Sequence, residues 1–428
     1  MREILRPGLL LALSTLLNPT PLDAAWEIQK IDADTSLSST KLDGDLAAYE
    51  KDGDIYLYRF SSGLLTPVTQ DLHDPVDLII DLNGEKLWYW AHAWGDPDYD
   101  LYEYDARSER KRRLLTTEAA VTLDHGVEDA GRLIIGMDND WWLWTDGRSE
   151  QLTFSGESLC KQQPWLQGDH LVWRAVAGTP GVYVTDLHSR ETWSIYENDD
   201  PPGSLCVSGP HVAWVDHPVA TAEETHVFHH RLDTGAFETV GTSEASALRQ
   251  LALQSPNLVW LKKMGPSWLI ISTNLEDGAE ECLYTSELPM VSTRVSGDDI
   301  LLVTDNCPGS LETCWEGNVF NQGSGVFTQL THFGTGSMIF SHWIDDKRII
   351  LERHATVFPY IHGAHVGVKT PDPLCGTLSH TAGITSWINL AFVLTPLTII
   401  PWLRRRLPSE QSQNPSRNLL TGLRKYLM

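Results

Sequence analysis

The stretch QGDHLVWRAVAGTPGVYVTDLHSRETW, residues 167–193, carries the clearest structural pattern in the sequence. It contains two apolar runs on either side of a Gly/Pro turn, and a polar turn then leads into a third run. Short runs rich in β-branched and aromatic residues, separated by Gly, Pro, Asp and Ser, are typical of antiparallel strands joined by tight turns. The stretch therefore predicts three neighbouring strands of one sheet.

The same pattern recurs along the chain. Each copy has a polar turn, an apolar run that often ends in Trp or Tyr, a loop and a second alternating run. A short run before the turn, such as PVDLIIDL or QQPWLQ, supplies a fourth strand. The copies start at residues 43, 83, 130, 167, 208, 255, 296 and 345. Starts roughly 40 to 50 residues apart match the spacing of four-stranded propeller blades.

The last copy, DDKRIILERHATVFPYIHGAHV from Asp345, lacks a convincing final strand. The segment AWEIQKID at residues 25–32 could supply it, and this pairing would close the ring and remove its exposed sheet edges. We therefore predict an all-β fold, an eight-bladed β-propeller over residues 26–368. Seven blades and a β-sandwich are the alternatives.

Both ends of the chain indicate export and anchoring. Residues 1–25 carry basic residues, then an apolar stretch and small residues, which is the layout of a secretory signal peptide; a buried helix is the alternative. After a linker at 369–383, residues 384–403 run uncharged for 20 residues and meet three arginines. This pattern predicts a transmembrane helix with a basic cytoplasmic tail at 404–428, so the propeller would lie outside the membrane at the cell envelope.

The charge of the middle of the chain excludes one class of partner. The whole chain has a formal net charge of -25. Residues 1–25 and 404–428 hold 8 basic and 3 acidic residues, which leaves 24 basic and 54 acidic residues between them. Such a surface repels phosphate backbones, so a nucleic-acid partner is not expected.

Cysteine positions fit an oxidising compartment. Cys307 and Cys314 flank the loop CPGSLETC, in which a local disulfide closes easily. Cys160 and Cys206 occupy similar places in successive copies and are a second candidate pair. Connectivity cannot be read from sequence alone, so these pairings stay open.

The copies resemble the TolB-like and WD40-like repeats of exported bacterial propellers, as in DGDLAAYEKDGDIYLYRFSSGLLTPVTQ at residues 43–70. The resemblance implies the fold but no single activity, because scaffolds, sugar-binding proteins and peptidase propellers share this repeat. The segment LCGTLSH at 374–380 resembles MYXO-CTERM sorting tails, which implies processing or lipid attachment at Cys375. Unlike those tails, the chain continues for 22 residues past the arginines.

No catalytic motif is evident. The pentapeptide G-x-S-x-G of serine hydrolases is missing, and TDLHSRETW resembles a quinone-dehydrogenase docking motif that does not recur. In HVFHH, His229 and His230 would face opposite sides of a strand, which favours packed or solvated histidines over a zinc site. Acidic loops such as WGDPDYDLYEYD lack the EF-hand order and could bind calcium only weakly. We predict no cofactor.

Tryptophans are concentrated in LWYWAHAW and DWWLW. They alternate between the faces of their strands, so many would pack between blades. The remainder could form an aromatic contact surface for protein or sugar. The candidates are Trp88, Trp90, Trp94, Trp141, Trp142 and Trp144.

These observations favour a membrane-anchored, non-enzymatic scaffold that binds a protein or glycan partner at the cell envelope. The alternative is an envelope hydrolase or lyase with its site in the central channel. Unpaired acidic residues at the mouth of that channel would support the alternative.

Overall fold

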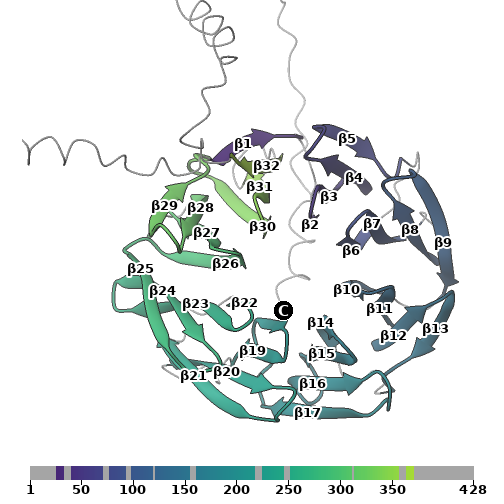
Figure 1. Cartoon of the computed structure of the whole chain (residues 1–428). Coiled ribbons are helices and arrows are strands. Elements are labelled where there is room, and N and C mark those ends of the chain that lie inside the picture. Colours follow the sequence, from purple (N-terminus) through teal and green to yellow (C-terminus); the bar gives the residue numbers. More distant parts are fainter. Residues whose placement is uncertain are drawn as a thin grey trace, which may run out of the picture. The chain divides into compact units, whose positions relative to one another are not determined.

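The strands of this chain form eight four-stranded antiparallel sheets arranged as blades around a ring (Figure 1). The computed structural model describes residues 26–32, 40–70, 77–92, 98–118, 121–154, 161–216, 224–244, 251–310, 313–355 and 363–370. Within these ranges the secondary structure is all β. The eight-bladed propeller is confirmed, and the seven-bladed and sandwich alternatives are excluded.

Blades 1 to 4 each follow the same order from the innermost to the outermost strand. Blade 1 contains β2 (Thr40–Asp43), β3 (Leu46–Lys51), β4 (Asp54–Arg59) and β5 (Leu64–Pro67). Blade 2 contains β6 (Leu78–Asn83), β7 (Lys86–Ala91), β8 (Tyr99–Asp105) and β9 (Arg110–Thr117). Blade 3 contains β10 (Val121–Asp129), β11 (Arg132–Met137), β12 (Asp140–Thr145) and β13 (Arg148–Gln151). Blade 4 contains β14 (Lys161–Gln167), β15 (His170–Ala175), β16 (Gly181–Asp186) and β17 (Thr192–Glu197).

Blades 5 to 7 repeat this order, and blade 8 differs in its outermost strand. Blade 5 contains β18 (Leu205–Ser208), β19 (His211–Val215), β20 (Glu224–Arg231) and β21 (Phe237–Glu244). Blade 6 contains β22 (Leu251–Gln254), β23 (Asn257–Met264), β24 (Ser267–Asn274) and β25 (Glu280–Ser286). Blade 7 contains β26 (Met290–Ser296), β27 (Asp299–Asp305), β28 (Trp315–Asn321) and β29 (Val326–Gln329). Blade 8 contains β30 (Ser337–Asp345), β31 (Arg348–Ala355), β32 (Gly363–Lys369) and β1 (Trp26–Lys30).

The ring closes through β1, as the sequence predicts. This strand pairs antiparallel with β32, so that Trp26 lies opposite Lys369 and Lys30 lies opposite His365. The fit is close, because a Cβ atom added at Gly367 would lie 2.5 Å from the Cδ1 atom of Ile28. Lys369, predicted to begin the linker, is instead the last residue of β32. The predicted signal peptide, the linker beyond Thr370, the membrane span and the basic tail lie outside the described residues. No helix that could cross a bilayer occurs within the described ranges.

The core consists of apolar clusters between neighbouring blades. Its largest recurring members are tryptophans on the second strand of a blade: Trp90, Trp173, Trp214 and Trp260 are fully buried. Two of these buried indole N–H groups donate to a threonine on the third strand of the same blade. The Nε1 atom of Trp173 donates to the hydroxyl of Thr185 at 3.1 Å, and that of Trp260 donates to Thr273 at 3.0 Å.

A second repeated contact joins the turns between the first and second strands. A backbone amide in this turn donates to the side chain that ends the innermost strand of the preceding blade. We call this set of contacts the turn ring. Its described pairs, donor first, are Gly44 with Asp345, Gly84 with Asp43, Gly209 with Gln167, Ser255 with Ser208, and Asp346 with Ser296. Among the described residues, these contacts join five of the eight pairs of neighbouring blades.

Candidate functional site

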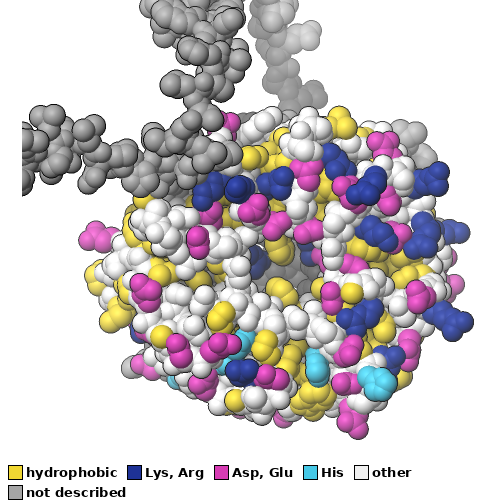
Figure 2. Space-filling model, in the orientation of Figure 1, with side chains coloured by type: hydrophobic (Ala, Val, Ile, Leu, Met, Phe, Trp, Pro, Cys, Tyr) yellow, Lys and Arg dark blue, Asp and Glu magenta, His cyan; other side chains and the backbone are white. Residues whose placement is uncertain are grey.

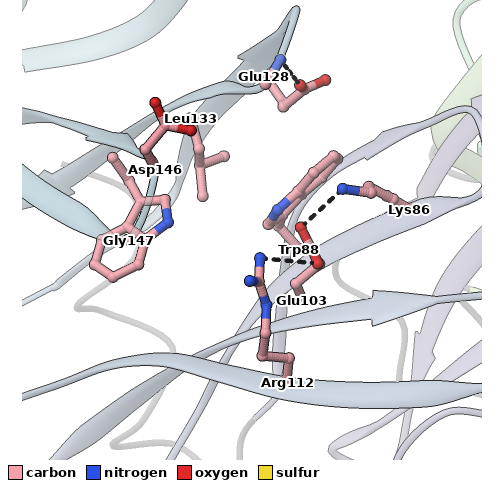
Figure 3. A pocket seen from close by; sticks show the side chains of 10 residues that line it. Lys86, Trp88, Glu103, Arg112, Glu128, Leu133, Asp146 and Gly147 are labelled. Carbon is pink, nitrogen blue, oxygen red and sulfur yellow. Dashed lines mark hydrogen bonds and ion pairs between the residues drawn. The ribbon is translucent and has the colours of Figure 1, made fainter.

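A groove of about 330 Å³ lies between blades 2 and 3. One wall comes from β7, β8 and β9, and the other comes from β10, β11 and β12 with their turns (Figure 3). We call it the groove. Its lining residues are Lys86, Trp88, Glu103, Arg112, Glu128, Gly131, Leu133, Trp144, Asp146 and Gly147.

The blade 2 wall consists of a network of charged side chains next to the indole of Trp88. The strand register places Trp88 opposite Glu103, and Glu103 opposite Arg112. Glu103 accepts hydrogen bonds from the Nζ atom of Lys86 at 3.2 Å and from the Nη2 atom of Arg112 at 3.1 Å (Figure 3). The Nζ atom of Lys86 also lies 6.0 Å from the ring centre of Trp88. One carboxylate therefore holds two cations in place, and one of them, Lys86, lies near the Trp88 ring.

The blade 3 wall is built by β10 to β12. Leu133 and Trp144 are cross-strand partners, and Trp144 is half-buried. Glu128 accepts hydrogen bonds from the side chain of Asn83 and from the amide of Gly131, each at 2.6 Å. Burial raises the pKa of Glu128, while these two hydrogen bonds lower it. Its bonds to a turn and to the neighbouring blade give Glu128 a structural role, so the raised pKa is no sign of catalysis by itself.

The groove offers fixed donors, fixed acceptors and a partly open indole. Lys86 and Arg112 are exposed and are held by Glu103, whereas Asp146 projects from the β12–β13 turn as an exposed carboxylate. Trp88 is only 4% exposed, so Trp144 is the more accessible aromatic side chain. Such a surface suits a ligand with both hydrogen-bonding groups and an apolar face.

The tryptophans of the predicted aromatic contact surface do not form one surface in the structure. Trp88 and Trp144 meet in the groove. Trp90 and Trp141 are fully buried, because their faces of the sheet pack against neighbouring blades, and so they form no contact surface. Trp142 is half-buried and donates from Nε1 to the carbonyl of Met137 at 3.3 Å. Trp94 lies outside the described residues.

The structure tests one of the two predicted cysteine pairs. Cys307 and Cys314 lie at disulfide distance in blade 7, with Cα atoms 5.3 Å apart. Cys206 is buried, and its Sγ atom lies 3.5 Å from the carbonyl oxygen of Ala213. Cys160 and Cys375 lie outside the described residues, so the Cys160–Cys206 pair and the sorting site stay predictions.

His229 and His230 of β20 lie on opposite faces of the strand, as the sequence pattern predicts. His229 is buried, whereas His230 lies on the other face of the strand and is half-buried. The two ring nitrogens of His229 contact His211 at 2.9 Å and Glu238 at 2.9 Å. Among the described residues, no three His, Cys, Asp or Glu side chains are grouped so that they could hold a metal ion.

Sequence reasoning missed the network of Lys86, Glu103 and Arg112. Each lies in an ordinary charged segment of blade 2, and only the strand register brings the three side chains together. The usable signal is the alternation in KLWYWA, DLYEYD and RKRR, because it places charged and aromatic residues on the same face of adjacent strands.

Comparisons with known proteins identify the class of fold. The sequence matches no protein-family model, and a search of curated proteins finds no relative. An oligogalacturonate lyase in complex with manganese aligns with a TM-score of 0.53 at 13% identity, covering 82% of this chain and 99% of that one. BamB from Moraxella catarrhalis aligns with a TM-score of 0.51 at 11% identity, covering 79% and 99%.

A third similar structure belongs to a longer protein. Dipeptidyl peptidase 4 from Porphyromonas gingivalis aligns with a TM-score of 0.53 at 10% identity, covering 77% of this chain but only 58% of the peptidase. At such low identity these similarities concern the fold alone. The chain is therefore an eight-bladed β-propeller, and its fold is similar to those of an oligogalacturonate lyase, a dipeptidyl peptidase and BamB.

Proposed function

We propose that this protein is a non-enzymatic binding scaffold of the cell envelope, and that the groove between blades 2 and 3 binds its protein or glycan partner. The proposal rests on one observation. A single recess is lined both by the indoles of Trp88 and Trp144 and by the Lys86–Glu103–Arg112 network. Two rigid sheets form this recess, so its donors and acceptors are ordered before a partner arrives. Such preorganisation lowers the entropy cost of binding.

The alternative is an envelope hydrolase or lyase with its site in the central channel. Similar structures include a lyase and a peptidase, so the fold is compatible with catalysis. Three carboxylates at the channel are nevertheless engaged in structure. Asp43 and Asp345 accept hydrogen bonds from backbone amides of the turn ring. Asp81 accepts a hydrogen bond from the backbone amide of Glu128 at 2.7 Å and forms an ion pair with Lys41 at 3.6 Å. These contacts favour the scaffold.

Export and anchoring are further parts of the proposal. They rest on the sequence patterns of residues 1–25 and 384–403. Cell fractionation should place the protein in the membrane fraction, and mass spectrometry should find a mature chain that begins near Trp26. Peptide mapping without reduction should recover the Cys307–Cys314 bridge and would show whether Cys375 carries a lipid. Recovery of the full, uncleaved chain from the cytosol would contradict export.

The binding role is tested with paired variants in the full chain. Trp144→Ala and Arg112→Ala alter the groove. Trp193→Ala and Lys111→Ala are matched controls, because Trp193 is exposed on blade 4 and Lys111 is exposed beside Arg112 without lining the groove. Each purified protein is used as bait on detergent-solubilised envelope and is tested on a glycan panel and for turnover of polysaccharides.

A stoichiometric partner that is lost with both groove variants and kept by both controls would support the scaffold. Capture of a protein or of a glycan would identify the class of partner. Turnover of a polysaccharide that is unchanged in the groove variants, without any stoichiometric partner, would instead support an enzyme in the channel.

A further inference from the structure

The wall of the central channel contains a cation without a counter-ion among the described residues. Arg294 lies on β26, the innermost strand of blade 7 (Figure 1). It is the single charged residue on the inner strands of blades 5, 6 and 7, whose sequences are LCVS, LALQ and MVSTRVS. Figure 2 shows the opening at the centre of the ring that these inner strands surround.

No described carboxylate offsets the charge of Arg294. Its Nε atom is buried and has no hydrogen-bond partner in the described part of the chain. Burial lowers the pKa of the guanidinium, and the only group that opposes this effect is Cys206. Cys206 cannot serve as an anion at neutral pH, because burial raises the pKa of its thiol to about 12. Arg294 is half-buried, with its Nε atom fully buried, and a partly buried cation without a partner is costly, so this position favours an anion.

Neighbouring side chains hold the guanidinium in place without neutralising it. Its Cζ atom lies 4.7 Å from the ring centre of Trp343 on β30, and the Nζ atom of Lys41 on β2 lies 5.4 Å from the same centre. A guanidinium stacked on an aromatic ring keeps its in-plane N–H groups available for a bidentate contact. His342 adds no charge, because burial and Arg294 lower its pKa to about 3.

We propose that Arg294 is an oxyanion-binding residue of the central channel, with Trp343 as its stacking platform. The ligand carries a carboxylate or a phosphate group, since both accept two parallel hydrogen bonds from a guanidinium. This site is separate from the groove between blades 2 and 3, so it does not depend on the proposed function.

Binding is tested on the purified full chain with acetate and phosphate as probes, against chloride at equal ionic strength. Arg294→Met removes the charge and keeps much of the length of the side chain. Arg231→Met is the control, because Arg231 is a surface cation paired with Asp233 at 2.8 Å. We expect saturable stabilisation by at least one probe in the wild type and in Arg231→Met. In Arg294→Met we expect affinity weaker by about tenfold to 100-fold, the range for a charge-assisted contact.

A second measurement does not depend on the stability of the variant. Phenylglyoxal labels accessible arginines, and peptide mapping reports the label on Arg294. Acetate or phosphate should slow labelling of Arg294 and leave that of Arg231 unchanged, and the protecting probe would show whether carboxylate or phosphate is preferred. Equal labelling rates at Arg294 in chloride, acetate and phosphate, with no anion-dependent stabilisation, would overturn the proposal.

Discussion

The hydrogen bond between the Trp260 indole and Thr273 allows a direct measurement of what a repeated core contact contributes. The donor and acceptor lie 3.0 Å apart on β23 and β24, and both residues are buried. Thr273→Val replaces the hydroxyl by a methyl group of similar size, so the indole N–H loses its acceptor while the packing is preserved. An unpaired buried donor costs about 1 to 3 kcal/mol of the free energy of unfolding.

This loss can be read from thermal unfolding followed by circular dichroism. For a domain of this size we expect Tm to fall by about 1 to 4 °C, since unfolding entropy is about 2 cal/mol/K per residue. Thr273→Ser keeps the acceptor and is the control. In a Trp260→Phe background, which has no indole N–H to satisfy, Thr273→Val should lower the free energy of unfolding clearly less. The difference between the two losses is the coupling energy of the contact. Equal losses in the two backgrounds would refute this account of the contact.

Three further changes test other parts of the fold by the same thermal assay. Gly241→Ala should lower Tm, because the new Cβ atom would lie 2.6 Å from the Trp260 ring, and an unchanged Tm would show that the ring can move aside. Lys161→Met should cost about 3 to 5 kcal/mol, since it removes the cation 2.9 Å from the buried Asp140 carboxylate; a neutral effect would argue against that pair. Burial lowers the pKa of His365 from 6.5 to about 4, so the unfolded chain binds the proton first as the pH falls. Stability is therefore full above about pH 6.5 and declines toward pH 4, and His365→Gln should reduce the difference in Tm between pH 7 and pH 5.

The ring could be predicted from sequence because its signals are local. Each copy carries its own turn residues and alternating runs within about 45 residues, and these do not depend on distant parts of the chain. Closure could be predicted as well, since the copy from Asp345 lacked one strand and residues 25–32 offered one.

The sites depend on information that a single strand does not carry. Trp88 and Trp144 belong to different blades, and they meet only because successive blades are neighbours in the ring. Trp90 lies on the same face of β7 as Trp88 and in the same apolar cluster, yet only Trp88 lines the groove, so access depends on the position along the strand as well as on its face. Arg294 was not singled out, since a lone arginine in a strand is ordinary until its surroundings are known.

The pairing of β1 with β32 constrains how the chain can be made. Blade 8 joins the first described strand to the last three, so it cannot be completed until β32 has been synthesised. Until then the growing protein carries an unpaired β1 and incomplete sheet edges, which readily pair with strands of other molecules. A chain that stops before Gly363 would keep this state permanently. Nonsense mutations upstream of the codon for Gly363 should therefore yield aggregates rather than a slightly shortened propeller.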